Sequence, residues 1–267
     1  MQSIVWTGRL ISRALLSGLP NYSTCADTNV SRKREPQFLS AVCGFPKEFA
    51  NARIKKGQFG DDAWFTAKFK TADVLGVADG VGGWRNYGID PGEFSAFLMQ
   101  TCERLVTSGR FSPHEPASML ARSYYELLEN KKSILGSSTA CVVVFTHTLP
   151  AQHASPGHSA SVLSDRPDSA DTCNFPVEEG DVILVATDGV FDNVPDQLLL
   201  TELSRVQGER DPVKIQHVAN SIAWMARSLA FDDKFMSPFA ISAQANGIHT
   251  VGGKPDDITV LLATVAF

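Results

Sequence analysis

The stretch VLGVADGVGGW (Val74–Trp84) combines a short apolar run, a single acid and a glycine-rich turn. The apolar run Val74–Ala78 predicts a buried strand, and Asp79 follows it directly. The glycines after Asp79 permit a tight turn in which a backbone carbonyl can approach a cation. Taken alone, an Asp-Gly pair is more typical of a turn or a helix cap than of a metal site. The other acids of the chain decide between these interpretations.

Three further acidic groups stand at the ends of expected strands. DVILVA (Asp181–Ala186) leads through Thr187 into Asp188, Asp256-Asp257 precede ITVLLATV (Ile258–Val265), and Asp61-Asp62 precede Ala63–Phe69. If each strand that ends in Asp pairs antiparallel with one that begins with Asp, all four groups meet at one sheet edge.

Converging carboxylates repel each other, and bound cations offset that cost. Oxygen ligands without His or Cys favour Mg²⁺ or Mn²⁺. Two such ions about 4 Å apart can share a water, lower its pKa and direct it at phosphorus. The pattern alone therefore predicts a carboxylate-dependent metallohydrolase.

The remaining periodicity predicts alternating strands and helices. Three- and four-residue spacing of apolar residues predicts helices over Glu93–Val106, Ala117–Lys131, Asp196–Val206 and Pro212–Leu229, and STACVVVF (Ser138–Phe145) predicts a buried strand. The segment Thr146–Ser161 lacks periodicity and is expected to be a solvated linker. Its three histidines match no standard metal-ligand spacing.

Composition excludes several classes of protein. The 267 residues are 43% hydrophobic, enough for one large domain, and the net charge of -5 argues against a nucleic-acid partner. No stretch reaches the roughly 18 apolar residues that predict a membrane-spanning helix. The five cysteines are odd in number and include no C-x-x-C pair, so neither a disulfide framework nor a zinc site is expected.

The first residues are typical of a targeting segment. Residues 1–26 contain no acid, and Arg9 and Arg13 lie among Ser, Thr and apolar residues. This composition favours a mitochondrial transit peptide and delivery to the matrix. A secretory signal with Ala14–Leu19 as its apolar region and a frayed terminus are the alternatives. We expect residues 1–40 to be leader and 41–267 to be the catalytic domain.

Five blocks, in this order, resemble the signatures of phosphatase 2C-type enzymes from near Gly44 to the C-terminus. They are GDDAWF (Gly60–Phe65), VADGVGGW (Val77–Trp84), GSSTACVVV (Gly136–Val144), ATDGVFDN (Ala186–Asn193) and GKPDDITVLL (Gly253–Leu262). The variant is most similar to the mitochondrial branch of that family.

The resemblance implies an α+β fold, a β-sandwich flanked by helices in α-β-β-α layers, with two Mn²⁺ or Mg²⁺ ions at one end. It implies hydrolysis of phosphoserine and phosphothreonine in protein substrates by a metal-bridging water. Asp79 would bridge both ions, the Gly80 carbonyl would bind one, and Asp188 and Asp256 would be direct ligands. Asp61 and Asp62 would act through metal-bound waters, and Asp192 and Asp257 would lie in the outer shell.

Two departures from the family pattern affect the expected activity. The arginine that many members place upstream of Gly60 to hold the substrate phosphate is replaced by Lys55 and Lys56, which can act only as point charges. The linker at 146–161 stands where the family continues into further strands. Roughly 40 residues of sandwich are expected to be missing, which would expose strand edges. A catalytically impaired phosphatase-like binding or scaffold protein is therefore the main alternative, and a hydrolase of small phosphate esters is a third.

Overall fold

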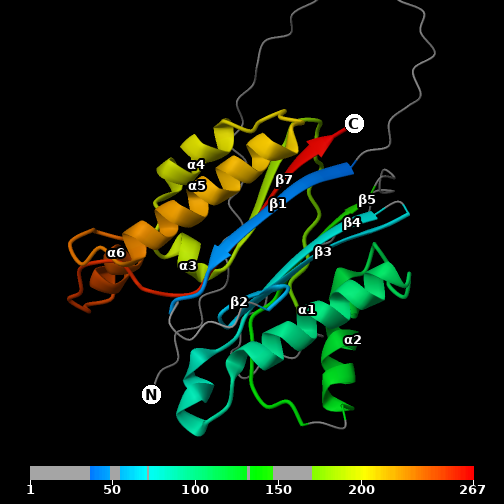
Figure 1. The fold of residues 1–267 in the computed structure, drawn as a ribbon, viewed down its shortest axis with the longest axis horizontal. Helices are drawn as coiled ribbons and strands as arrows, with labels where there is room; N and C mark the ends of the chain where they lie inside the picture. Colours follow the sequence, from blue (N-terminus) through cyan, green and yellow to red (C-terminus); the bar gives the residue numbers. More distant parts are fainter. Residues whose placement is uncertain (1–36, 49–54, 71, 131–132, 147–169) are drawn as a thin grey trace, which may run out of the picture.

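The fold is a sandwich of two antiparallel sheets between two layers of helices (Figure 1). The computed structural model describes residues 37–48, 55–70, 72–130, 133–146 and 170–267. One sheet has the order β1 (Gln37–Phe45), β7 (Ile258–Ala266), β6 (Val182–Ala186), and the other β2 (Gln58–Phe59), β3 (Asp62–Phe69), β4 (Ala72–Asp79), β5 (Cys141–Thr146). The expected α-β-β-α layering is confirmed.

The helices follow the predicted periodicity closely and cover the outer faces of the sheets. α1 (Pro91–Thr107) and α2 (Pro116–Leu128) lie on the four-stranded sheet, whereas α4 (Asp196–Ser204) and α5 (Pro212–Ala230) lie on the three-stranded one. The two longest helices, α1 and α5, each begin with Pro after an Asp cap, and the Asp90 and Asp211 side chains accept hydrogen bonds from Gly92 N and Val213 N. None of the helices in the described ranges is both long and apolar enough to cross a membrane.

A third apolar cluster fills the space between the sheets. Its buried members come from strands of both sheets: Phe38, Leu75, Val77, Phe145, Val185, Leu261, Ala263 and Val265. Phe38 of β1 stacks on Phe145 of β5, with ring centroids 4.6 Å apart. All nine residues of β7 are buried, because β7 lies between β1 and β6 and is covered on both faces. Packing across the sandwich thus fixes how the strand ends of the two sheets face each other.

The structure adds elements that the sequence pattern did not predict. β1 pairs with the whole length of β7, from Gln37 opposite Ala266 to Phe45 opposite Ile258. The expected boundary between leader and catalytic domain, at residue 40, lies inside this strand. The short helices η1 (Gly82–Tyr87), α3 (Asp188–Phe191) and α6 (Pro238–Ala245) were also not predicted.

The two expected irregular segments lie mostly outside the described residues. This holds for residues 1–36 of the leader and for residues 147–169, which include the three linker histidines. The strand expected from Ser138 begins at Cys141. Within the described part of the chain, β5 and β6 are the last strands of their sheets, and no further strand pairs with their outer edges.

Candidate metal and phosphate site

The predicted antiparallel pairing brings the acidic strand ends together. Asp62 at the start of β3 is the direct register partner of Asp79 at the end of β4. β6 runs antiparallel to β7, so Asp188, just after β6, and Asp256, just before β7, lie at the same end. The charges of Asp188 and Asp256 both act on Asp79 across the sandwich. The acids therefore form one cluster with members from both sheets.

The backbone around Asp79 is fixed by the segment that precedes β5. Ser138 Oγ donates to the Asp79 carbonyl at 2.8 Å and Thr139 N donates to it at 2.9 Å, while Asp79 N donates to Thr139 Oγ1 at 3.2 Å. Gly80 N donates to the Asp61 carbonyl at 3.2 Å. A Cβ at Gly80 would come within 2.5 Å of the Pro91 carbonyl oxygen, so only glycine fits at that position.

The environment of Asp79 disfavours its ionised form. Burial is the largest cause, the nearby charges of Asp188 and Asp256 add to it, and together they raise the pKa of Asp79 to about 8. The carboxyl of Asp62, which is 1% exposed, also has a strongly raised pKa because of burial and the neighbouring Asp79. Such carboxyl groups are ionised at neutral pH only when a cation accompanies them.

Asp62 joins the two sheets. Its Oδ2 accepts hydrogen bonds from Thr187 Oγ1 at 2.6 Å and Thr259 Oγ1 at 2.8 Å, both from the opposite sheet's strand ends. Its Oδ1 is buried and has no hydrogen-bond partner among the described residues. One oxygen of Asp62 is thus structural, and the other is left for a group that the protein itself does not supply.

Asp257 fixes the turn that carries Asp61. Its Oδ2 accepts from Asp61 N at 2.7 Å and its Oδ1 accepts from Lys47 N at 2.6 Å. Gly60 has a φ of +69°, and a Cβ there would come within 2.0 Å of Asp257 Oδ1. The Asp61 carboxylate forms an ion pair with Arg85 of η1. Burial raises the Asp61 pKa, and Arg85 partly offsets that effect.

Lys254 places its ammonium among the remaining acids. Its Nζ lies 2.7 Å from Asp188 Oδ2, 2.7 Å from Asp192 Oδ2 and 3.3 Å from Asp256 Oδ2. Burial works against the charged ammonium, but the charge and hydrogen bond of Asp188 and the contacts with Asp192 outweigh it and raise the Lys254 pKa. Burial raises the pKa of Asp192, and Lys254 opposes that shift.

Sequence reasoning did not identify the two basic side chains of the site, those of Lys254 and Arg85. Lys254 lies inside the quoted block GKPDDITVLL and Arg85 directly follows VADGVGGW, so both stood next to recognised motifs. The partner of a long basic side chain depends on tertiary structure, which the motifs do not contain. Lys55 and Lys56, predicted as phosphate ligands, are exposed in the turn before β2 and form no ion pair with the described acids.

The donor set fits a divalent cation of the Mg²⁺ or Mn²⁺ type. It consists of carboxylate oxygens and backbone carbonyls, and Asp188 Oδ1, like Asp62 Oδ1, is buried without a hydrogen-bond partner among the described residues. As the described side chains stand, no three His, Cys, Asp or Glu residues could hold a metal ion. In this arrangement the Lys254 ammonium contacts Asp188 Oδ2 and Asp256 Oδ2.

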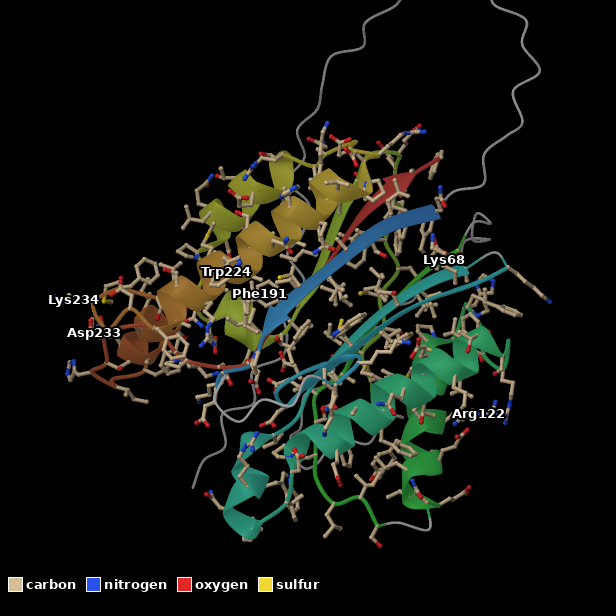
Figure 2. All side chains as sticks on the ribbon, viewed as in Figure 1. Lys68, Arg122, Phe191, Trp224, Asp233 and Lys234 are labelled. Carbon is tan, nitrogen blue, oxygen red and sulfur yellow. The ribbon has the colours of Figure 1, made fainter. Side chains whose placement is uncertain are left out.

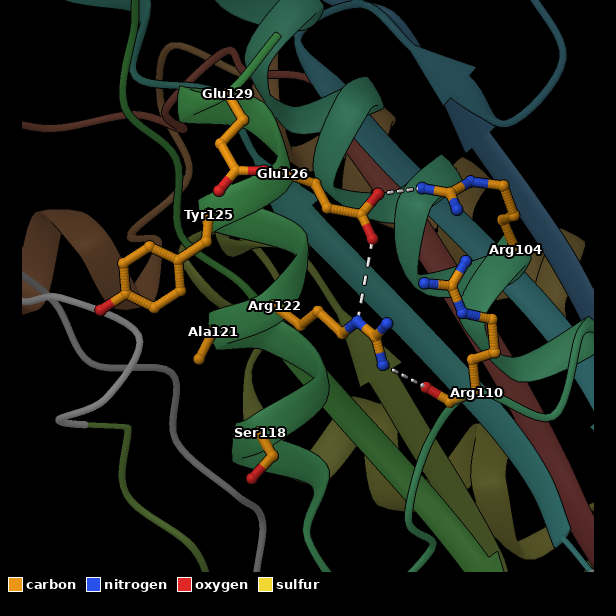
Figure 3. A pocket seen from close by; sticks show the side chains of 8 residues that line it. All are labelled: Arg104, Arg110, Ser118, Ala121, Arg122, Tyr125, Glu126 and Glu129. Atoms are coloured by element: carbon orange, nitrogen blue, oxygen red, sulfur yellow. Dashed lines mark hydrogen bonds and ion pairs between the residues drawn. The ribbon is translucent and has the colours of Figure 1, made fainter.

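A separate hollow of about 790 Å³ lies on the outer helix layer, between α1 and α2 (Figure 3). Arg104 and Arg122 both pair with Glu126 there, and Arg122 Nη1 donates to the Arg110 carbonyl at 3.2 Å. None of the predicted site residues lines this hollow. The acid cluster is therefore the candidate functional site.

Comparison with known proteins identifies the family. The chain is 46% identical to the protein phosphatase PTC7 homolog of Danio rerio and 45% identical to that of Homo sapiens, over all of this chain and 99% of each relative. The chain belongs to the phosphatase 2C family. It is a protein serine/threonine phosphatase. No protein-family model matches the chain.

The structural comparison supports the fold of this phosphatase 2C family member. The photosystem II phosphatase PBCP aligns with a TM-score of 0.65 and 23% identity, over 85% of this chain and 98% of that one. The sequence alignment with the Danio rerio PTC7 homolog runs over 303 positions, whereas this chain has 267 residues, a difference of 36. This difference is close in size to the segment expected to be missing.

Proposed function

We propose that the chain hydrolyses phosphoserine and phosphothreonine in protein substrates with two Mn²⁺ or Mg²⁺ ions held by the acid cluster. One observation carries the proposal: the strand ends of both sheets bring Asp79, Asp188 and Asp256 together, and one oxygen of Asp188 has no partner among the described residues. Membership of a family of protein phosphatases supports the substrate class.

Each residue has a definite role in this proposal. Asp79, Asp188, Asp256 and the Gly80 carbonyl would hold the ions, and Asp61 and Asp62 would orient their waters. Asp192 and Asp257 would lie outside these ligands, with Asp257 fixing the Asp61 backbone. When bound, divalent ions lower the pKa of water and polarise a phosphoryl group.

Arg85 is a better candidate than Lys55 or Lys56 for holding the substrate phosphate. Its guanidinium is anchored on Asp61 beside the acid cluster, and its side chain is 60% exposed. A guanidinium can donate two parallel hydrogen bonds to a phosphate, which an ammonium cannot.

The first test compares wild type with Asp79→Asn in Mn²⁺-dependent hydrolysis of a phosphothreonine peptide. Metal ions contribute several kcal/mol of transition-state stabilisation, so we expect turnover to fall about a thousandfold. Asp196→Asn is the matched control, because Asp196 is an exposed acid of α4 outside the cluster. Circular dichroism confirms that all three proteins are folded. Wild-type turnover by Asp79→Asn would contradict the proposed role of the cluster.

The alternative is a catalytically impaired binding or scaffold protein. It rests on the 36 positions by which the chain is shorter than its alignment with the Danio rerio relative, and on the outer edges of β5 and β6, which no further described strand pairs with. A folded wild-type chain without Mn²⁺- or Mg²⁺-dependent turnover would favour this alternative. A comparison of phosphopeptide with a small phosphate ester separates a protein phosphatase from a general esterase.

The acid-free composition of residues 1–26 supports the further proposal that the enzyme is delivered to the mitochondrial matrix. Microscopy of the full chain fused at its C-terminus to a fluorescent protein tests the location. Fluorescence that does not coincide with a matrix marker would overturn it.

A further inference from the structure

The ammonium of Lys254 occupies a position that a metal ion would need. It contacts one oxygen each of Asp188, Asp192 and Asp256, at 2.7, 2.7 and 3.3 Å. Two of these acids are proposed direct ligands. The contacts leave Asp188 Oδ1 buried without a hydrogen-bond partner among the described residues. The protein has thus placed a monovalent cation of its own among carboxylates that suit a divalent one.

The placement of Lys254 is fixed by the fold and is not an accident of a long side chain. Lys254 N donates to Asn193 Oδ1 at 2.8 Å, and Asn193 Nδ2 donates to the Lys254 carbonyl at 2.9 Å. Asn193 is fully buried, and its amide also donates to the Gly189 carbonyl at 2.9 Å. The ammonium in turn lies 5.8 Å from the centroid of the Phe239 ring. Backbone and side chain of Lys254 are therefore both held beside the acids.

We propose that Lys254 is a built-in counter-cation that competes with a divalent metal ion for Asp188 and Asp256. The inference rests on the proposed metal site and adds a control on how tightly that site binds. In the metal-free protein the ammonium offsets one of three negative charges and holds the carboxylates together. On loading, the ion must displace the ammonium from its oxygens or bind beside a like charge, and either event weakens binding.

The test is Lys254→Met, which keeps most of the length and apolar stem of the side chain and removes the charge. Calorimetric titration with Mn²⁺ measures the dissociation constant, and thermal unfolding in EDTA measures the stability of the metal-free protein. We expect the dissociation constant of at least one site to fall about tenfold. We also expect the melting temperature in EDTA to fall, because three carboxylates lose their cation.

Two further variants separate the local effect from general charge effects. Lys234→Met removes one positive charge from the loop between α5 and α6 (Figure 2). Lys234 is exposed there and forms no ion pair with the described residues of the acid cluster. It should leave Mn²⁺ affinity and stability in EDTA unchanged. Lys254→Arg retains the charge and should keep the weaker, wild-type affinity.

The possible outcomes are distinct. Tighter Mn²⁺ binding by Lys254→Met alone supports the inference, whereas unchanged or weaker binding by that variant overturns it. If neither wild type nor Lys254→Met binds Mn²⁺, the proposed metal site itself is wrong and the inference fails with it. A Lys254→Met chain that is unfolded in EDTA but recovered by Mn²⁺ below the wild-type dissociation constant supports the inference. A chain that stays unfolded at every Mn²⁺ concentration contradicts it.

Discussion

Arg85 replaces Lys55 and Lys56 as the candidate residue for holding the substrate phosphate. The guanidinium is tied to Asp61 at the edge of the acid cluster and remains largely exposed. Replacing it with lysine keeps the charge but removes the planar fork that matches a phosphate. We expect Arg85→Lys to raise KM for a phosphothreonine peptide about fivefold to tenfold, equivalent to roughly 1 kcal/mol, with a smaller change in kcat.

The matched control is Arg110→Lys, an exposed arginine of the hollow between α1 and α2 (Figure 3). That variant should have wild-type kinetic parameters. If Arg85→Lys and Arg110→Lys both leave KM unchanged, Arg85 does not hold the phosphate, and Lys55 and Lys56 become the residues to test.

At the scale of single residues, the sequence predicted the acids but not what they contact. Asp79, Asp188 and Asp256 could be located because each stands next to an apolar strand, and strand direction alone predicts that they meet. The donors to Asp62 are Thr187 and Thr259, which lie on strand ends of the other sheet. Such contacts depend on how two sheets pack, and sequence periodicity within one strand does not specify that packing.

Strand β1 shows what an unrecognised element contributes. It is an edge strand that pairs along its whole length with β7, and its Phe38 is 2% exposed and stacked on Phe145. The chain without residues 1–36 keeps the whole of β1 and serves as the reference. The chain without residues 1–40 loses Phe38 and should be less stable by about 3–5 kcal/mol. Denaturant unfolding followed by circular dichroism measures the difference, and equal midpoints would show that β1 contributes little.

At the scale of helices and strands, an element could be predicted from the sequence only where the spacing of its apolar residues was clear. The long helices and apolar strands were located to within a few residues, because their patterns repeat over several turns or alternate around a buried run. β1 follows the basic run Arg32-Lys33-Arg34 and was not predicted as a strand, and its first four residues were assigned to the leader on composition. The eight-residue helix α6 was missed because Pro238–Ala245 buries only Ala240 and carries no clear apolar stripe.

The whole molecule gathers carboxylates from both sheets, so its stability should depend on pH and on metal together. The pKa of Asp79 is raised to about 8 by burial and by Asp188 and Asp256. A raised carboxyl pKa contributes stability below its ordinary value near 4, and that stability is lost as pH rises towards 8. In EDTA the melting temperature should therefore fall between pH 5 and pH 8, and less steeply in Asp79→Asn.

On the proposal that the ionised carboxylates bind Mn²⁺, the ion should reverse this dependence, because it would stabilise the folded chain by mass action. The rise in melting temperature caused by Mn²⁺ should be larger at pH 8 than at pH 5. Differential scanning calorimetry of wild type and Asp79→Asn, with EDTA and with Mn²⁺, provides all four curves. Parallel pH dependence in wild type and variant would show that Asp79 does not titrate in this range.

The hydrogen bonds from Thr187 and Thr259 to Asp62 join the two sheets, and this determines when the acid cluster can assemble during synthesis and folding of the chain. Asp62 and Asp79 belong to one sheet, and Asp188 and Asp256 flank strands of the other. A nascent chain cannot assemble the full set until its last strand, β7, has left the ribosome and joined the sandwich. Until then the proposed metal site is incomplete, so neither metal binding nor the proposed hydrolysis can begin before β7 has joined the sandwich.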